Sequence, residues 1–484
     1  MKKNSNNFVC FSSIEISNPI INHQTVKSNI TLNKTNNEKI NFEIILKYDE
    51  DVNHKNMPLL RLAFCMPLLN YGLFTKKFIL KFPISQEDFK ILNHLNKIFS
   101  RDIFVNKILR RRTNYILPDF LPNEKKIKPR DAESKAVFLP KKITNNIFIS
   151  TNFNINNCGI LSSGGKESLL TYGILKEIGA NVYPLYINES GGHWRTALTA
   201  YHYHKESQPN TQKVWTNIDR FYVFMLDNLK FIRSDHRKIR ADTYPIRLCI
   251  FPFYVFSLLP IFLEKKIGNL LIGSEFDDLK IKPVYKEIHH YFGVYDQHQD
   301  YDLLMNEWYH KRLLGLYQWS ALRNTSGLIV ERILTKRYPS LASLQRSCHS
   351  CHFENNEIVP CGNCSKCMGV LLFLLANRAD PKIMNFKGKD IELFTKRINP
   401  ENLRLDEDEK NQSFYLIGEK DKIPNVKPID HVEKIHINKD NSDLEQIPVH
   451  LRKNILKIIE SYTTGFCELK NKNWVSLEES KINF

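Results

Sequence analysis

The chain has 484 residues, of which 42% are apolar and 25% are charged, the composition of an ordinary soluble globular protein. These values exclude collagen-like, wholly disordered and disulfide-scaffold classes, and the length predicts two to four domains. The formal net charge of +17 is compatible with nucleic acid, an anionic surface or a phosphate-rich ligand. Because the basic residues are spread along the chain, nucleic acid is retained as a partner but not favoured.

The start of the chain does not resemble a secretory signal, because polar NSNN follows the two lysines where an apolar core would begin. We therefore expect a cytoplasmic protein. The apolar run 248–263 is shorter than the ~18–20 residues that a spanning helix needs, and it contains Pro252 and Pro260. It predicts a buried helix and no membrane partner.

Residues 1–148 predict a mixed α/β N-terminal domain. The segments 40–48 and 75–84 read as strands, and 85–99 reads as a helix with apolar residues at helical spacing. The basic cluster RRRTNY at 110–115 is interpreted as a solvated loop. No catalytic motif is found in this part of the chain.

Residues 149–390 predict a second, α/β domain. A strand at 157–163, a helix at 169–179 and a strand at 180–188 form a βαβ unit, which implies a parallel sheet with a right-handed crossover. Further elements are predicted by apolar patterns: a strand at 269–274 and helices at 303–323, 328–336 and 369–379. Residues 391–484 are a C-terminal extension that ends with an amphipathic helix at 449–462.

A glycine-bearing loop lies between the first strand and helix of the βαβ unit. It consists of Ser162, Ser163, Gly164, Gly165, Lys166, Glu167 and Ser168. Two glycines allow a sharp turn and close approach to an anion, and the following helix directs unpaired N–H groups and its positive dipole end there. The loop is too short for G-x-x-x-x-G-K-[ST] and lacks G-x-G-x-x-G spacing. It therefore suits a pyrophosphate group held mainly by backbone.

The string SGGKES resembles the S-G-G-x-D-S signature of PP-loop ATP pyrophosphatases, with Glu167 where that family usually has Asp. Members of the family cleave ATP to AMP and pyrophosphate while they adenylate a substrate oxygen. The resemblance implies ATP and Mg²⁺ as cofactors.

Five of the ten cysteines lie between positions 348 and 367, in SCHSCHFENNEIVPCGNCSKC. Cys361, Cys364 and Cys367 have the two-residue spacing of thiolate ligands in one tetrahedral shell, with a fourth returning from a loop. Structural zinc is the favoured occupant, an iron–sulfur cluster is the alternative, and His349 or His352 could replace one thiolate.

A PP-loop domain followed by this cluster resembles the 7-cyano-7-deazaguanine synthase (QueC) family of queuosine biosynthesis, over residues 155–385. That family's zinc spacing matches Cys351, Cys361, Cys364 and Cys367, with Cys348 as the alternative first ligand. Further matches are His193 in ESGGHW, Tyr244–Arg247 (YPIR), Ile272–Asp278 (IGSEFDD) and Ala376–Pro381 (ANRADP). The resemblance implies an adenine-nucleotide α-hydrolase-like parallel sheet with helices on both faces and a zinc knuckle of four cysteines.

The resemblance also implies an ATP-dependent ligase that forms C–N bonds. A small-molecule carboxylate would be activated as an acyl adenylate and attacked by ammonia or an amine. Lys166, Glu167 and Arg247 are the candidate catalytic residues. Asp277 and Asp278 are candidates for Mg²⁺ or for helix capping, and Lys280 and Lys282 are weaker cation candidates.

Other functions stay open at this point. The substrate could instead be a peptide, a sugar-acid nucleotide or a protein terminus, since ESGGHW departs from the family's Y-G-Q-R-H and no S-G-Y-P-D-C string follows EFDD. A tRNA-modifying PP-loop enzyme and a nucleotide-sensing scaffold are further alternatives. A homodimer is compatible with all of them.

Overall fold

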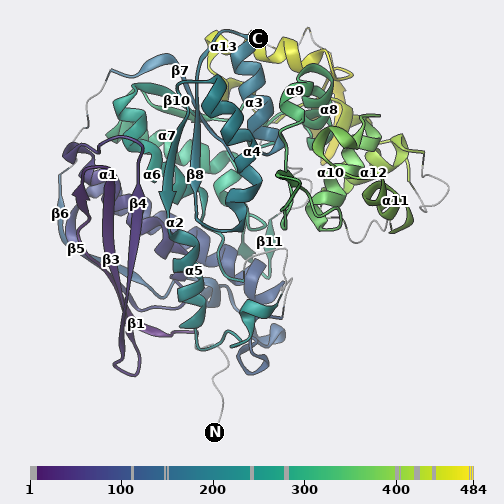
Figure 1. Ribbon diagram of the computed structural model, residues 1–484. Helices are drawn as coiled ribbons and strands as arrows, with labels where there is room; N and C mark the ends of the chain where they lie inside the picture. Colours follow the sequence, from purple (N-terminus) through teal and green to yellow (C-terminus); the bar gives the residue numbers. More distant parts are fainter. Residues whose placement is uncertain are drawn as a thin grey trace.

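The computed structural model describes residues 8–482 apart from 111–113, 146–148, 150–151, 240–244, 277–282, 398–402, 404, 419–425, 439–442, 479 and 481, and the side chains of His193 and Arg397. Its main feature is one eleven-stranded mixed sheet in the order β13-β10-β7-β8-β9-β4-β3-β1-β5-β6, with β2 paired to β3 (Figure 1). The α/β class predicted from the sequence is confirmed.

The strands of this sheet come from both sides of the expected boundary at residue 148. They are β1 (Phe11–Ile16), β2 (Ile20–Asn22), β3 (Thr25–Lys34), β4 (Lys39–Lys47), β5 (Lys77–Ser85), β6 (Val137–Thr144), β7 (Asn154–Leu161), β8 (Asn181–Asn188), β9 (Gln212–Thr216), β10 (Ile267–Leu271) and β13 (Tyr317–Trp319). Smaller sheets pair β11 (Val284–Tyr285) with β12 (Ile288–His289), β14 (His352–Glu354) with β15 (Glu357–Val359), and β16 (Ile435–Ile437) with β17 (Phe466–Lys470) and β18 (Asn473–Leu477).

The helices connect and cover these strands. They are α1 (Met57–Cys65), α2 (Gln86–Ile103), α3 (Lys166–Glu177), α4 (Gly192–Ser207), α5 (Ile218–Asp227), α6 (Phe251–Glu264), α7 (Gln299–Arg312), α8 (Gly327–Arg337), α9 (Pro339–Ala342), α10 (Ser365–Ala376), α11 (Gly388–Arg397), α12 (Glu407–Leu416) and α13 (Val449–Glu460). The predicted helix at 303–323 is wrong in its second half, where β13 forms. Gly315, at φ +101°, breaks the helical path and lets Tyr317–Trp319 pair with β10.

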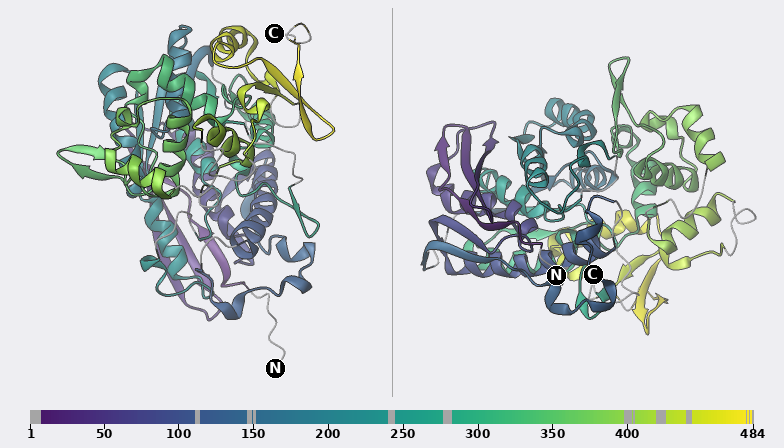
Figure 2. Two further views of the ribbon diagram at one scale, coloured as in Figure 1. Left: turned by 90° about the vertical axis from the view of Figure 1, so that its right-hand side faces the viewer. Right: turned by 90° about the horizontal axis from the view of Figure 1, so that it is seen from below.

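The five strands β9, β8, β7, β10 and β13 are parallel throughout. Successive side chains of these strands point to opposite faces of the sheet, where they pack in two different hydrophobic cores. Cys158 and Ile160 of β7 pack with α3 and α8, whereas Tyr183 and Leu185 of β8 pack with α6. Helices therefore cover both faces of this part of the sheet (Figures 1 and 2), as parallel strands require.

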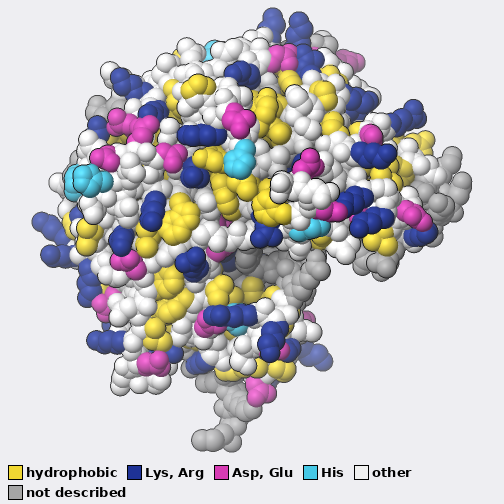
Figure 3. Space-filling model, in the orientation of Figure 1, with side chains coloured by type: hydrophobic (Ala, Val, Ile, Leu, Met, Phe, Trp, Pro, Cys, Tyr) yellow, Lys and Arg dark blue, Asp and Glu magenta, His cyan; other side chains and the backbone are white. Residues whose placement is uncertain are grey.

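The run predicted to be a buried helix forms α6, which packs in the larger core. Within the described parts of the chain, no helix has both the length and the apolar character needed to cross a bilayer. On the face shown in Figure 3, Lys and Arg side chains are interspersed with Asp and Glu side chains. That distribution does not form a basic stripe on this face.

The two halves of the sheet meet where β4 pairs antiparallel with β9. The pairing joins Leu46 to Thr216 and Lys47 to Trp215, and the side chain of Asn217 then continues the ladder. Its Oδ1 accepts from the N–H of Ile45 (2.9 Å), and its Nδ2 donates to the carbonyl of Glu43 (2.8 Å). One buried amide thus joins the N-terminal strands to the parallel ones.

We predict that Asn217→Ala lowers the free energy of unfolding by about 1–2 kcal/mol, because two backbone groups lose their partner. Urea unfolding measures the change. The matched control is Asn156→Ala, an exposed asparagine in β7, which should change stability by less than about 0.5 kcal/mol. Equal effects of the two substitutions would contradict the role assigned to Asn217.

Candidate phosphate loop and metal centre

The loop predicted to bind phosphate runs from the end of β7 to the start of α3. Gly164 has φ +72°, and a Cβ there would lie 3.0 Å from the carbonyl oxygen of Thr196 and 3.2 Å from Cα of Ala197. Glycine is therefore required for the fold of this turn. Gly165 is the N-cap residue of α3, φ −85°, and its cap position makes no side-chain hydrogen bond to the helix. The first-turn N–H groups of α3 are thus directed toward the loop.

Lys166 points into the protein rather than toward solvent. Its ammonium contacts the Glu167 carboxylate and lies 2.7 Å from Oε2 of Glu275, which follows β10. Burial acts to lower the pKa of Lys166, but the two carboxylates outweigh it and the pKa lies above its ordinary value. Burial acts to raise the pKa of Glu167, and Lys166 holds it below its ordinary value. Lys166 and Glu167 thus form a charged pair in which Lys166 is buried and Glu167 is partly buried.

Two further glutamates, neither predicted from the sequence, face this pair. Burial, together with the negative charges of Glu167 and Glu275, raises the pKa of Glu331 on α8 to about 7. Glu331 accepts from Nε2 of Gln345 (3.2 Å). Burial, with Glu275 nearby, also raises the pKa of Glu409 on α12 well above its usual range. The group combines one ammonium, the two carboxylates in contact with it, and two buried glutamates whose pKa values lie above the ordinary value.

Arg247 belongs to a second polar group at the same edge of the sheet. Its Nη1 donates to Oδ1 of Asp219 (2.7 Å), and its guanidinium lies 4.7 Å from the ring centroid of Tyr222. Glu189, just after β8, accepts from the hydroxyl of Tyr254, and burial raises its pKa to about 7. Because Glu189 and Asp219 follow neighbouring parallel strands, this group lies beside the phosphate loop.

The backbone after Arg247 is held by two buried side chains. Oδ1 of Asn70, from the N-terminal half, accepts from the N–H groups of residues 248 and 249 at 2.7 and 2.8 Å. Oδ2 of Asp296 accepts from the N–H groups of residues 250 and 251, both at 3.0 Å. The N-terminal half therefore helps to position Arg247.

Several predicted site residues lie outside the described residues. They are Tyr244, Asp277, Asp278, Lys280 and Lys282. The side chain of His193 is likewise not described. Glu275 could have been found in the sequence, because a polar residue within a few positions of the end of a parallel strand lies at the edge where ligands bind. Glu331 and Glu409 have no such signal, since they lie within helices.

Four cysteines converge in a knuckle formed by the segment after α9 and the first turn of α10, which contains Cys367. The Sγ atoms of Cys348, Cys361, Cys364 and Cys367 all lie within 4.8 Å of one another. The separations Cys364–Cys367, Cys348–Cys364 and Cys361–Cys367 are 3.5, 3.9 and 4.0 Å. A tetrahedral zinc with ~2.3 Å bonds to sulfur requires about 3.8 Å between sulfurs, so the four thiols fit such a metal.

Backbone donors and one glycine support this arrangement. The N–H groups of Ser350 and Cys361 both donate to Sγ of Cys348 at 3.2 Å, as expected for a thiolate. Gly362 has φ +71°, and a Cβ there would lie 2.3 Å from Oδ1 of Asp390. The CGNC turn therefore needs its glycine.

The first cysteine of the group is Cys348, the alternative that the sequence left open. Cys351 lies outside the group of four, with its Sγ 3.6 Å from the carbonyl oxygen of Arg346. His349 and His352 are not part of the group either, and His352 is exposed. The chain returns to the CxxCxxC turn at position 348, three residues earlier than the spacing of the QueC family implies.

Comparisons with protein families, curated proteins and solved structures found no match for this chain. The chemistry of the site therefore rests on the residues described above.

We predict that Cys348→Ser reduces bound zinc from about one per chain to well below half, because the shell loses one thiolate. Cys351→Ser is the matched control and should keep its metal. Elemental analysis of the purified variants gives the metal content. Loss of metal from the Cys351 variant with retention in the Cys348 variant would reverse the ligand assignment.

We also predict a pH effect from Glu331. Its pKa is about 7 in the folded chain, against an ordinary value of 4.5. As the pH rises between these values, only the unfolded chain releases the proton, so the free energy of unfolding falls. The glutamine in Glu331→Gln cannot ionise. The free energy of unfolding of this variant should therefore fall less than that of the wild type between about pH 5 and about pH 8, by on the order of 2 kcal/mol. Urea unfolding at both pH values tests this, and identical declines would show that Glu331 ionises normally.

Proposed function

We propose that the chain is an ATP-dependent ligase of the PP-loop kind, which activates a carboxylate as an acyl adenylate and releases AMP and pyrophosphate. The observation that carries the proposal is the position of the loop 162–168. From β7, the chain adds β8 and then β9 on one side of that strand, and β10 and then β13 on its other side. The loop after β7 therefore lies at the point where the order of the parallel strands across the sheet reverses. In open parallel sheets, ligands bind outside the carboxyl ends of the strands at such a point.

The chain's own groups fit a pyrophosphate there. The N–H groups at the start of α3 and the dipole of that helix stabilise negative charge, and exposed Ser163 can donate a hydroxyl hydrogen bond. Lys166 lies in the first turn of α3, where Glu167 and Glu275 hold its ammonium in place. Their carboxylate oxygens are ligands of the type that Mg²⁺ prefers, and Mg²⁺ would neutralise charge on the phosphates.

The proposed reaction has two steps. A substrate carboxylate oxygen attacks the α-phosphorus, the bond to the β-phosphate oxygen breaks, and pyrophosphate leaves with the bond electrons. An amine nitrogen next attacks the acyl carbon, loses a proton, and AMP leaves. The loop stabilises charge that grows on the phosphates in the first step.

The resemblance of the second half to the QueC family supports 7-carboxy-7-deazaguanine as the first substrate to test, with ammonia as the amine and zinc in the knuckle. The geometry of the four thiols supports zinc, since tetrahedral sites of four thiolates favour it. The interspersed charges in Figure 3 give no specific support to a tRNA substrate.

The test is incubation with ATP, Mg²⁺, ammonium and 7-carboxy-7-deazaguanine labelled with ¹⁸O in its carboxylate. Label should appear in AMP, with pyrophosphate as the second product, because that oxygen attacks the α-phosphorus. Labelled inorganic phosphate with ADP would contradict the proposal. Other carboxylates, including peptides, are tested by the same assay if the deazaguanine gives no AMP.

Gly165→Ala provides the accompanying variant. A Cβ there meets only side-chain oxygens, Oε2 of Glu167 at 3.0 Å and Oγ of Ser163 at 3.3 Å, so the fold can adjust while the phosphate position is obstructed. We predict at least about a tenfold loss of AMP formation with a melting temperature within about 3 °C of the wild type. Gly388→Ala, at the first residue of α11 with nothing near its Cβ, is the control and should stay active.

A further inference from the structure

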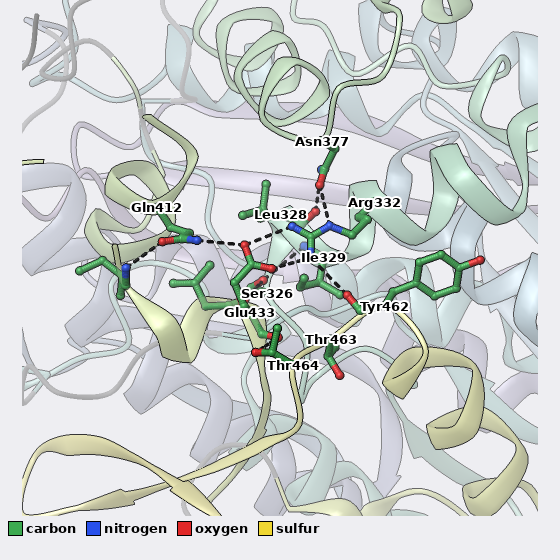
Figure 4. Close-up of polar contacts among 12 residues, drawn as sticks. Ser326, Leu328, Ile329, Arg332, Asn377, Gln412, Glu433, Tyr462, Thr463 and Thr464 are labelled. Carbon is green, nitrogen blue, oxygen red and sulfur yellow. Dashed lines mark hydrogen bonds and ion pairs between the residues drawn. The ribbon is translucent and has the colours of Figure 1, made fainter. Parts of the chain in front are cut away.

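The C-terminal region, here the described part of residues 403–478, is tied to α8 by a partly buried ion pair. Arg332 binds both carboxylate oxygens of Glu433, at 2.5 and 3.1 Å (Figure 4). Its remaining donors reach Oδ1 of Asn377 (2.8 Å) and the carbonyl oxygen of Tyr462 (3.2 Å). Gln412 donates to the same Glu433 carboxylate at 3.0 Å. Together these contacts fix the C-terminal region against α8.

The same region touches the start of α8, next to the Lys166 group. The N–H of Gly327 donates to Oε1 of Glu409 at 2.5 Å. A Cβ on Gly327 would lie 2.8 Å from Oε2 of Glu275, the oxygen that faces the Lys166 ammonium. Glu409 therefore holds a backbone segment that packs directly on Glu275.

A pair of stacked rings makes the second contact between the C-terminal region and the Lys166 group. The rings of His436 and Phe276 lie parallel, with centroids 3.6 Å apart and planes 6° apart. Both residues are buried, and Trp474 packs edge-on against Phe276 with centroids 5.3 Å apart. Phe276 follows Glu275 directly, so the stack restrains the same turn.

Both nitrogens of the His436 ring are engaged. Nε2 lies 3.0 Å from Nδ1 of His431, whose Nε2 lies 2.8 Å from Oδ2 of Asp408. Nδ1 of His436 lies 3.3 Å from the carbonyl oxygen of Asn324. With neither nitrogen directed at a reacting group, His436 acts through the position of its ring.

We propose that the C-terminal region is a built-in part of the nucleotide site, and that His436 is a positioning residue which, through Phe276, holds Glu275 against Lys166. The proposal rests on the function proposed above for the loop. It predicts that displacing His436 loosens the 272–276 turn and the 162–168 loop together, because Lys166 loses one of its two carboxylates.

The test compares His436→Ala with His436→Phe, which keeps a flat ring in the stack, and with His450→Ala, an exposed histidine of α13. Amide hydrogen exchange is read over 162–168 and 272–276, with β8 as the internal reference. We expect His436→Ala to raise exchange in both segments at least about fivefold, and the Phe and His450 variants to match the wild type. Unchanged exchange in both segments would overturn the proposal.

AMP formation is measured on the same variants. His436→Ala should raise the KM for ATP at least about tenfold, with recovery in His436→Phe. If the wild type itself forms no AMP but the exchange pattern holds, the proposed function fails and the positioning role stands.

If His436→Ala raises exchange over all of 430–470, Phe276→Leu is measured instead, because it removes the same ring stack by changing Phe276. Unchanged exchange in 162–168 in that variant would then overturn the proposal.

Discussion

The burial of one ammonium, that of Lys166, is the constraint on which the arrangement of the site depends. A buried charge is costly unless it is paired, and here the pairing groups come from different parts of the chain. Glu167 is its neighbour on α3, Glu275 follows β10, and both reach it only because glycines flank them. A Cβ at Gly273 would lie 2.7 Å from Cβ of Glu167, and one at Gly327 would meet Glu275. The lysine thus draws the ends of β7 and β10 and the start of α8 into one assembly.

The cysteine knuckle extends this assembly to the other side of the loop. Ser347 precedes the ligand Cys348, and its Oγ lies 4.0 Å from the position of a Cβ on Gly165. Gln345, two residues earlier, donates to Glu331 of the carboxylate group. A metal held by the four thiols would therefore order a segment that touches both the phosphate loop and the carboxylates. The projecting β14–β15 hairpin (Figure 2) lies within the same knuckle.

The parts of the fold that the sequence predicts are those with local signals. The βαβ unit follows from apolar periodicity and from two glycines, and α6 follows from length and proline positions. The sequence predicts helix where β13 forms because Leu313, Leu316 and Trp319 also fit a helical repeat. The junction of β4 with β9 has no local signal, since it pairs residues about 170 positions apart. Spacing alone could not separate Cys348 from Cys351, because the return of the chain in space decides which thiol joins the shell.

The β4–β9 junction has a consequence for synthesis. While the chain emerges from the ribosome, the N-terminal strands can pair among themselves, but the outer edge of β4 over Glu43–Lys47 lacks its partners until β9 and Asn217 have been made. At ~5–20 residues per second, that interval is on the order of 10–30 s. An open strand with the sequence NFEIIL is a template for pairing with other chains. Nascent molecules are therefore most exposed to aggregation in this interval, and holdase chaperones that cover the β4 edge would have their largest effect there.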